Sequence, residues 1–238
     1  MTKKVAIFGD SISKGIVYED GKLRRIDDCV VNLIADEYGF EIRNFARYGL
    51  TLSKLDKKQT VEKFIDETAE EADNYAVLSI GGNDADYDWK AVAQNPFFDH
   101  LPNTPVEEFE VLLQNKVKLL ISAGIKVILT TIPPVDSKRY FDNVISKIAD
   151  GQKVLEFFDG DVTNISRHQE VYNYSIIKVA TQNACPIIDL RTGFLLDRKY
   201  LRNYCIDGIH PNELGHKFMA EEVVNSLARQ GVDLKKYS

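Results

Sequence analysis

Cysteine is scarce in this chain, and its distribution excludes two common uses of the residue. The sequence has three cysteines, Cys29, Cys185 and Cys205, an odd number without C-x-x-C spacing. Such a set predicts neither a disulfide framework nor a zinc site. It fits a reducing compartment best, and we therefore expect a cytoplasmic protein.

Long apolar runs are missing too. Only four apolar residues, Val5 to Phe8, stand directly before Gly9, which is too few for the apolar region of a secretory signal. No stretch approaches the ~20 apolar residues that span a bilayer. We expect no signal peptide and no insertion into a membrane.

The chain also lacks an excess of basic residues. Thirty Lys and Arg residues stand against 36 Asp and Glu, the formal net charge is -6 at pH 7, and no long basic cluster occurs. Binding to a phosphate backbone requires a concentrated field of positive charge. Nucleic acid is therefore excluded as an expected partner.

The remaining composition is that of a globular protein. Hydrophobic residues make up 44% of the chain and charged residues 28%, which is typical of a soluble domain. A chain of 238 residues buries roughly 70–75% of its unfolded surface, enough for a sizeable core. No internal repeat or linker divides it, so we expect a single domain over residues 1–238.

Short apolar runs alternate with helical periodicity along the chain. Five runs are candidate strands: Lys4–Phe8, Glu41–Ala46, Ala76–Ile80, Lys126–Thr131 and Pro186–Leu190. Three helical patterns are clear: one from Pro105 to Ala123, one from about Ser166 to Asn183, and one from the N-cap candidate Asn212 to Gly231. Strand–helix alternation predicts crossovers that coat both faces of a parallel sheet. We expect an α/β fold, a three-layer α/β/α sandwich around a mostly parallel five-stranded sheet.

Three side chains of the kind used by serine hydrolases occur at the two ends of the chain. Ser11 follows the first apolar run in Gly9-Asp10-Ser11-Ile12, and Asp207 stands three residues before His210. A serine hydroxyl becomes a nucleophile when a histidine takes its proton and a carboxylate orients that histidine. A turn that brings residues i and i+3 together lets Asp207 reach one ring nitrogen while the other faces Ser11.

Two more segments end predicted strands with residues that fit an oxyanion site. Asn83 follows the run Ala76–Ile80 within Gly81-Gly82-Asn83-Asp84, so its amide can donate to a developing oxyanion. Gly49 follows the run from Glu41 and lets a backbone N–H approach a reacting group closely. Ligands in open parallel sheets bind beyond the carboxyl ends of the strands.

With these residues the chain resembles a known family, the SGNH (GDSL-type) hydrolases. The family is named for a Ser, a Gly, an Asn and a His, which correspond here to Ser11, Gly49, Asn83 and His210. The resemblance spans residue 5 to about residue 227, and it departs only at Ile12, where the GDSL tag has Leu, a volume-conserving change. It implies the flavodoxin-like SGNH hydrolase fold and a serine esterase that needs no metal and no cofactor.

The resemblance also implies a role for each residue. Ser11 is expected to attack an ester carbonyl, His210 to accept its proton, and Asp207 to stabilise the imidazolium. The N–H groups of Ser11 and Gly49 and the amide of Asn83 are expected to form the oxyanion hole. Taken singly, each residue has a structural alternative: a helix cap for serine, a turn residue for aspartate and asparagine, a strand terminator for glycine.

Other titratable residues have simpler interpretations. His216 lies six residues after His210, whereas helical metal partners are three or four apart, so we interpret it as structural. His100 and His168 lack matching partners, and we expect them to be solvated. Asp10 and Asp84 adjoin the candidate residues, and we expect each to brace its loop by accepting backbone N–H bonds.

Two long segments, residues 84–104 and 133–164, are expected to form walls or a lid and to choose the substrate. They interleave aromatic and charged side chains, which suits a small or medium soluble ester such as an O-acylated carbohydrate, although ordinary solvated loops have the same composition. The candidate substrate-binding residues are Arg47, Tyr87, Trp89 and Tyr140. Tyr48, beside Gly49, is a further candidate for the pocket wall. A lysophospholipase or thioesterase and a non-catalytic carbohydrate-binding module stay as alternatives, and oligomeric state is left open.

Two further classes are disfavoured by missing motifs. The segment Gly9 to Gly15 matches neither phosphate-binding glycine pattern, and the charge of Asp10 repels phosphate. An ordinary α/β-hydrolase is disfavoured because the chain has no G-x-S-x-G elbow.

Overall fold

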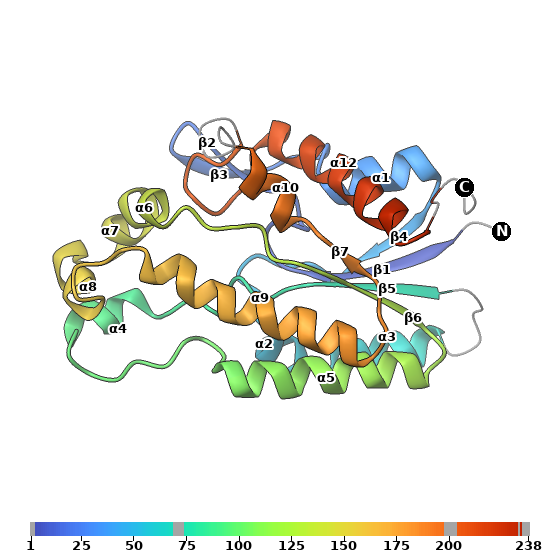
Figure 1. The fold of residues 1–238 in the computed structure, drawn as a ribbon, viewed down its shortest axis with the longest axis horizontal. Helices are drawn as coiled ribbons and strands as arrows, with labels where there is room; N and C mark the ends of the chain where they lie inside the picture. The colour runs from blue at the N-terminus through green and yellow to red at the C-terminus, as the bar shows by residue number, and fades with distance from the viewer. Residues whose placement is uncertain (1–2, 69–73, 198–203, 233, 235–238) are drawn as a thin grey trace.

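A computed structural model describes residues 3–68, 74–197, 204–232 and 234. Its centre is a parallel sheet of five strands in the order β4-β1-β5-β6-β7 (Figure 1). The strands are β1 (Lys4–Gly9), β4 (Glu41–Asn44), β5 (Asn74–Ser79), β6 (Lys126–Thr130) and β7 (Ile187–Ile188). All five lie within or beside the apolar runs that predicted them.

The order of the strands creates a switch point in the middle of the sheet. From β1 the chain moves outward to β4 on one side and then returns to build β5, β6 and β7 on the other. Val5 pairs with Ile42 of β4 and with Tyr75 of β5, so β1 has a parallel neighbour on each side. Ligands of open α/β sheets bind at the carboxyl edge near such a reversal.

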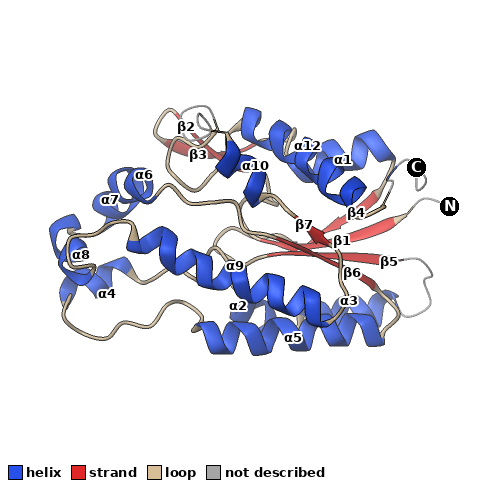
Figure 2. Ribbon diagram, viewed as in Figure 1, coloured by secondary structure: helices blue, strands red, loops and turns tan. Residues whose placement is uncertain are grey.

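Helices cover both faces of the sheet, which confirms the predicted three-layer α/β/α sandwich (Figures 1 and 2). On one face lie α1 (Val30–Tyr38), α10 (Arg191–Leu196) and α12 (Glu213–Arg229). The other face carries α2 (Leu52–Lys57), α3 (Thr60–Thr68), α5 (Val106–Ser122) and α9 (Asn164–Gln182). Asn212 caps α12 as predicted, because its side chain accepts a hydrogen bond from the N–H of Gly215.

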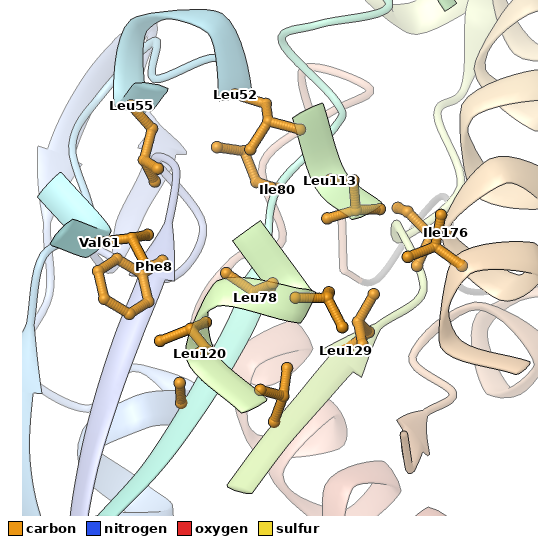
Figure 3. Packing of buried hydrophobic residues seen from close by; sticks show 14 of the residues in the cluster. Phe8, Leu52, Leu55, Val61, Leu78, Ile80, Leu113, Leu120, Leu129 and Ile176 are labelled. Atoms are coloured by element: carbon orange, nitrogen blue, oxygen red, sulfur yellow. The ribbon is translucent and has the colours of Figure 1, made fainter. Parts of the chain in front are cut away.

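The larger hydrophobic core lies between the sheet and the second group of helices. Phe8, Leu78 and Leu129 project from neighbouring strands into side chains of α3, α5 and α9 (Figure 3). All three are buried, and burial of a side chain of this size contributes about 1.5–3 kcal/mol. This packing holds the central strands, and hence their carboxyl ends, in fixed positions.

The two long segments contain helices rather than extended loops. The first carries α4 (Trp89–Gln94); the second carries α6 (Ser137–Tyr140), the π-helix η1 (Phe141–Ile145), α7 (Ser146–Ile148) and α8 (Gly151–Phe157). Their aromatic and aliphatic side chains form a separate buried cluster that includes Trp89, Tyr140 and Ile145. The segments therefore build a small helical layer beyond the carboxyl edge of the sheet.

An antiparallel hairpin of β2 (Ile16–Glu19) and β3 (Lys22–Arg25) follows the first strand and has no counterpart in the predicted elements.

No helix among the described residues has the length and apolar character required to cross a membrane.

Candidate active site

Ser11 lies two residues beyond the end of β1, at the switch point of the sheet. The turn that carries it depends on Gly9, where an added Cβ would lie 2.4 Å from the Oγ of Ser13. The Ser11 carbonyl accepts a hydrogen bond from the N–H of Ile16, which closes the turn. The side chain is held in a buried position, with 6% of its surface exposed.

Ser11, His210 and Asp207 form one hydrogen-bonded chain. The Oγ of Ser11 lies 3.0 Å from the Nε2 of His210. The Nδ1 of the same ring lies 2.7 Å from the Oδ2 of Asp207. The structure thus joins residues 199 positions apart, in the arrangement that lets a histidine take a serine proton while a carboxylate orients the ring.

The carboxylate of Asp207 is fixed by its own turn. Its Oδ1 accepts hydrogen bonds from the N–H groups of Ile209 and His210, at 3.1 and 2.8 Å. Burial raises the pKa of Asp207, but the hydrogen bonds and charge of His210 outweigh burial, so the pKa lies below its usual value. Asp207 is therefore ionised at neutral pH and can stabilise a positive charge on His210.

Gly208 locks this turn against the helical layer. Its φ angle is +93°, in the region that favours glycine. Its carbonyl accepts a hydrogen bond from the N–H of Asp136 at 2.9 Å. An added Cβ would lie 2.4 Å from the backbone nitrogen of Tyr140 and 2.7 Å from the Asp136 carbonyl. Because both atoms belong to the backbone, the turn tolerates only glycine.

Asn83 reaches the same site from the end of β5. Its Nδ2 donates a hydrogen bond to the Oδ2 of Asp10 at 3.4 Å. Ser11, Asn83 and His210 line one pocket of about 90 Å³. Gly49 has a φ angle of +63°. Neither Gly49 nor Arg47 is among the described residues that line this pocket, and the side chain of Arg47 is exposed.

Asp84 connects the loop of Gly49 to the loop of Asn83. Its Oδ1 accepts a hydrogen bond at 2.8 Å from the N–H of Leu52, the residue after the helix cap Thr51. Asp10 accepts the N–H of Ile12 at 3.0 Å. The prediction that each aspartate braces its own loop through a backbone N–H is confirmed for Asp10, whereas Asp84 accepts the N–H of a different loop. Burial raises the pKa of Asp84 to about 7 and that of Asp10 to about 6.

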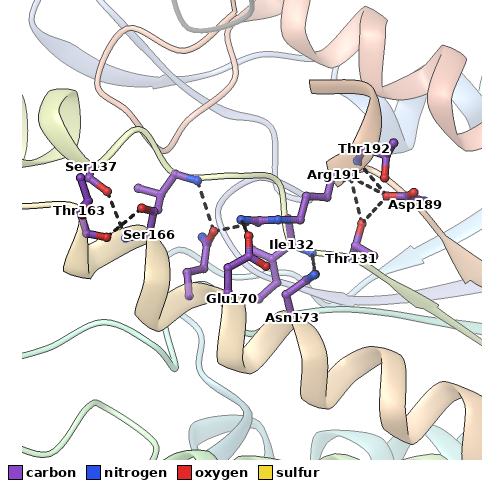
Figure 4. A network of polar contacts seen from close by, with 12 residues as sticks. Thr131, Ile132, Ser137, Thr163, Ser166, Glu170, Asn173, Asp189, Arg191 and Thr192 are labelled. Atoms are coloured by element: carbon purple, nitrogen blue, oxygen red, sulfur yellow. Dashed lines mark hydrogen bonds and ion pairs between the residues drawn. The ribbon is translucent and has the colours of Figure 1, made fainter. Parts of the chain in front are cut away.

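Side chains of α9 and α10 hold the other wall of the pocket (Figure 4). The Oε1 of Gln169 accepts hydrogen bonds from the N–H of Val135 and from the buried guanidinium of Arg191. Arg191 also donates to the carbonyl of Ile132 at 2.9 Å. Asn173 accepts the N–H of Ile132 at 3.1 Å. These contacts fix the segment after β6, which lines the pocket.

Two of the four predicted substrate-binding residues are tied into the helical layer. Trp89 is 4% exposed, and its Nε1 donates to the hydroxyl of Tyr140 at 3.3 Å. The Tyr140 hydroxyl in turn donates to the Oδ2 of Asp86 at 2.7 Å. Tyr140 lines the pocket, whereas Trp89 does not. The expectation that Trp89 binds substrate is therefore corrected: the ring is buried among its neighbours.

Other aromatic residues also differ from the expectations. Tyr87 lies outside the pocket lining and contacts His168, whose Nε2 is 3.3 Å from the tyrosine hydroxyl. The prediction of a solvated His168 is wrong, because the ring is half-buried and burial lowers its pKa. Tyr48, predicted beside Gly49 as a candidate for the pocket wall, is 61% exposed and stacks on His210 with ring centres 6.3 Å apart. Its position beside Gly49 was the only sequence signal for it.

His216 has the structural role expected of it. The ring is fully buried, and its Nδ1 accepts a hydrogen bond from the N–H of Val30 at 3.2 Å. Burial lowers the pKa of His216 to about 4, so the ring is neutral. Within the described part of the chain, no three His, Cys, Asp or Glu side chains are grouped closely enough to hold a metal ion.

One protein-family model matches most of the chain. The model of the GDSL-like Lipase/Acylhydrolase family matches residues 7–218. No curated protein matches the chain.

Solved structures resemble this chain over nearly its whole length. A lipase/acylhydrolase from Enterococcus faecalis shares 20% identity at a TM-score of 0.66, covering 96% of this chain and 97% of that one. Axe2, an acetylxylan esterase from Geobacillus stearothermophilus, shares 18% identity at a TM-score of 0.65, with 94% of each chain covered. LAE5, an alpha/beta hydrolase enzyme from the metagenome of Lake Arreo, shares 20% identity at a TM-score of 0.63, with 95% of each chain covered. At these identities the likeness demonstrates a shared fold.

Proposed function

The chain belongs to the GDSL-like lipase/acylhydrolase family of ester-hydrolysing enzymes, and we propose that it acts as a serine esterase through an acyl-enzyme on Ser11. One observation carries this proposal: the chain of hydrogen bonds from Ser11 through His210 to Asp207, at 3.0 and 2.7 Å. The burial of all three side chains supports it further, because electrostatic interactions are stronger where water is excluded.

In the proposed mechanism the Oγ of Ser11 attacks the ester carbonyl carbon while the Nε2 of His210 takes the serine proton. Asp207 stabilises the imidazolium. The N–H groups of Ser11 and Gly49 and the Nδ2 of Asn83 stabilise the tetrahedral oxyanion. The intermediate collapses, the alcohol leaves with the proton from His210, and an acyl-enzyme remains. A water molecule, deprotonated by His210, then releases the acid and restores Ser11.

We propose a short acyl group for the substrate. A pocket of about 90 Å³ beside Ser11 has room for a few carbon atoms but not for a long chain. The exposed ring of Tyr48 beside His210 is available to stack on the alcohol part of a soluble ester. An O-acylated carbohydrate fits this arrangement, and acetylated xylo-oligosaccharides are the first candidates because Axe2, which shares the fold, is an acetyl-xylooligosaccharide esterase. A cytoplasmic location is part of the proposal, supported by three free cysteines.

The test is a comparison of kcat/KM for acetyl, butyryl, octanoyl and palmitoyl p-nitrophenyl esters, run beside acetylated xylose. We expect the highest kcat/KM for acetyl and butyryl esters. Ser11→Ala should show no turnover. In the unmodified protein, a fluorophosphonate should label Ser11 covalently. Near wild-type turnover by Ser11→Ala would remove Ser11 from the mechanism. Activity that climbs to palmitoyl would instead favour a lysophospholipase or thioesterase.

A further inference from the structure

The loop that carries Asn83, residues 81–86, has little rigidity of its own. Gly81 and Gly82 stand directly before Asn83, and glycine has more backbone freedom than other residues. Within the loop, the N–H of Asp86 donates to the carbonyl of Asn83 at 3.4 Å, which is longer than the usual distance of about 2.9–3.0 Å. Contacts from outside the loop are therefore needed to fix the position of Asn83.

The side-chain amide of Asn83 is oriented by Asp10. Its Nδ2 lies 3.4 Å from the Oδ2 of Asp10, whose other oxygen accepts the N–H of Ile12 at 3.0 Å. An ionised carboxylate only accepts hydrogen bonds, so the amide turns its nitrogen toward Asp10. One N–H is then bound by Asp10, and the second is left for the oxygen of a substrate. Because 3.4 Å is close to the limit of a hydrogen bond, a small displacement of Asn83 would release the amide.

The backbone of the same loop is held by Asn103, in the segment between α4 and α5 (Figure 1). The Nδ2 of Asn103 donates to the carbonyl of Asn83 at 2.9 Å. The N–H of Asn103 donates to the carbonyl of Asp86 at 2.7 Å, and the N–H of Thr104 to that of Asp84 at 3.1 Å. Two consecutive residues thus bind three carbonyl groups of the loop, and the shortest bond to the Asn83 carbonyl comes from the Asn103 side chain.

The segment that carries Asn103 is itself anchored to the core. Prolines stand on both sides, at positions 102 and 105, and proline restricts its own backbone and that of the residue before it. Thr104 is fully buried, and its Oγ1 donates to the Oγ of Ser53 at 3.1 Å. Its carbonyl accepts the hydroxyl of Tyr172, a buried residue of α9, at 2.6 Å. The backbone beside the exposed side chain of Asn103 is therefore a fixed point.

We propose that Asn103 is a positioning residue for the oxyanion donor Asn83. Its side-chain amide fixes the backbone of Asn83, so that Asp10 keeps the Asn83 amide directed at the reacting oxygen. Asn103 is not among the described residues that line the catalytic pocket, and it acts through Asn83 rather than on the substrate. The inference rests on the proposed oxyanion role of Asn83, and it predicts a loss in kcat with little change in KM.

The test is a double-mutant cycle with p-nitrophenyl acetate at pH 8. Asn103→Ala should lower kcat about fivefold, as expected for the loss of one neutral hydrogen bond, with KM nearly unchanged. Asn103→Asp keeps the shape of the side chain but turns a carboxylate toward the Asn83 carbonyl, so it should lower kcat at least as much. In the Asn83→Ala background both changes should leave kcat within about twofold, because the donor that they displace is already absent.

Asn95→Ala and Asn95→Asp are the matched controls. Asn95 is an exposed asparagine of the same segment, and it uses its carbonyl rather than its side chain to bind the Nε2 of His100, at 2.8 Å. Neither control should change kcat. Urea unfolding checks that the two Asn103 variants are folded, and either of them completes the cycle if the other is not.

Two outcomes overturn the proposal. One is a wild-type kcat, or a higher KM at constant kcat, in a folded Asn103 variant. The other is an equal loss of kcat in the wild-type and Asn83→Ala backgrounds, which would mean that Asn103 acts by a route other than Asn83. Labelling of Ser11 by a fluorophosphonate tests the proposed nucleophile separately. A labelled Ser11 with an additive cycle refutes the positioning role alone, whereas full turnover by Ser11→Ala refutes the proposed esterase mechanism.

Discussion

Replacing Asp84 with asparagine is expected to remove a pH-dependent loss of stability. Asp84 is fully buried, and its Oδ1 accepts the N–H of Leu52 at 2.8 Å. Burial raises the pKa of this carboxyl from 3.8 to about 7. Asparagine has the same shape and keeps a carbonyl oxygen for Leu52, but it does not ionise. The substitution therefore tests the cost of charge at this position with little change in packing.

The magnitude follows from the two pKa values. A carboxyl whose pKa is higher in the folded than in the unfolded chain binds its proton more tightly when folded. Its stabilising contribution is complete below pH 3.8 and is lost as the pH rises through about 7. One pKa unit corresponds to about 1.4 kcal/mol, so the full loss is about 4 kcal/mol. Burial also raises the pKa of Asp10, to about 6. Ionisation of Asp10 therefore lowers the free energy of unfolding as the pH rises, in the wild type and in Asp84→Asn alike.

Urea unfolding at pH 5, 6, 7 and 8 measures the effect. The free energy of unfolding of the wild type should fall across this range, and that of Asp84→Asn should fall less, so the difference between them grows with pH toward about 4 kcal/mol. Asp66→Asn, which removes an exposed carboxylate from α3, controls for the loss of one negative charge. Parallel curves for wild type and Asp84→Asn would refute the argument that charge at Asp84 is costly.

Three further changes test the proposed catalytic site. Asn83→Ala should raise the barrier by about 2.7–4 kcal/mol, seen in kcat more than in KM; a large rise in KM at constant kcat would mean that Asn83 binds substrate in its ground state. Asp207→Asn should lower kcat about 10⁴-fold in a protein that still folds, because the ring loses its orienting acceptor, and turnover within tenfold of wild type would contradict the triad. Gly208→Ala should abolish activity, since the added Cβ would lie 2.4 Å from the backbone nitrogen of Tyr140; an active, fully stable variant would show that the turn can move away from α6.

The parts of the fold that could be predicted are those governed by local pattern. The central strands β1 and β6 are short apolar runs because residues on both of their faces are buried or partly buried. The long helices carry their own signals, such as the cap Asn212. The hairpin of β2 and β3 had no such signal, since its second strand, Lys22–Arg25, is exposed throughout and three of its four residues are basic. A strand that is exposed along its whole length, as β3 is, lacks the apolar alternation that marks a strand.

The aromatic residues of the long segments could not be assigned from composition. A ring that stacks on a substrate and a ring that packs in a small core have the same neighbours in sequence, and only tertiary contacts distinguish them. Trp89 contacts Tyr140, which is 51 residues away, and both belong to a buried cluster. Tyr48, in contrast, is exposed and stacks on His210, and no periodicity along the chain indicates that contact.

The same distinction separates the proposed catalytic residues from their supports. Ser11, Asp207 and His210 were predictable because the chemistry restricts their types and because Asp207 and His210 are three residues apart. The residues that hold them act across the chain: Asp84 binds the N–H of Leu52, 32 positions away. Such a bond exists only after β4 and β5 have taken their places on either side of β1. We infer that this carboxyl, although costly to charge, is kept because it joins the two loops that carry Gly49 and Asn83. A variant at Asp84 that removes the hydrogen bond to Leu52 should therefore displace the proposed oxyanion donors before it displaces Ser11, His210 and Asp207.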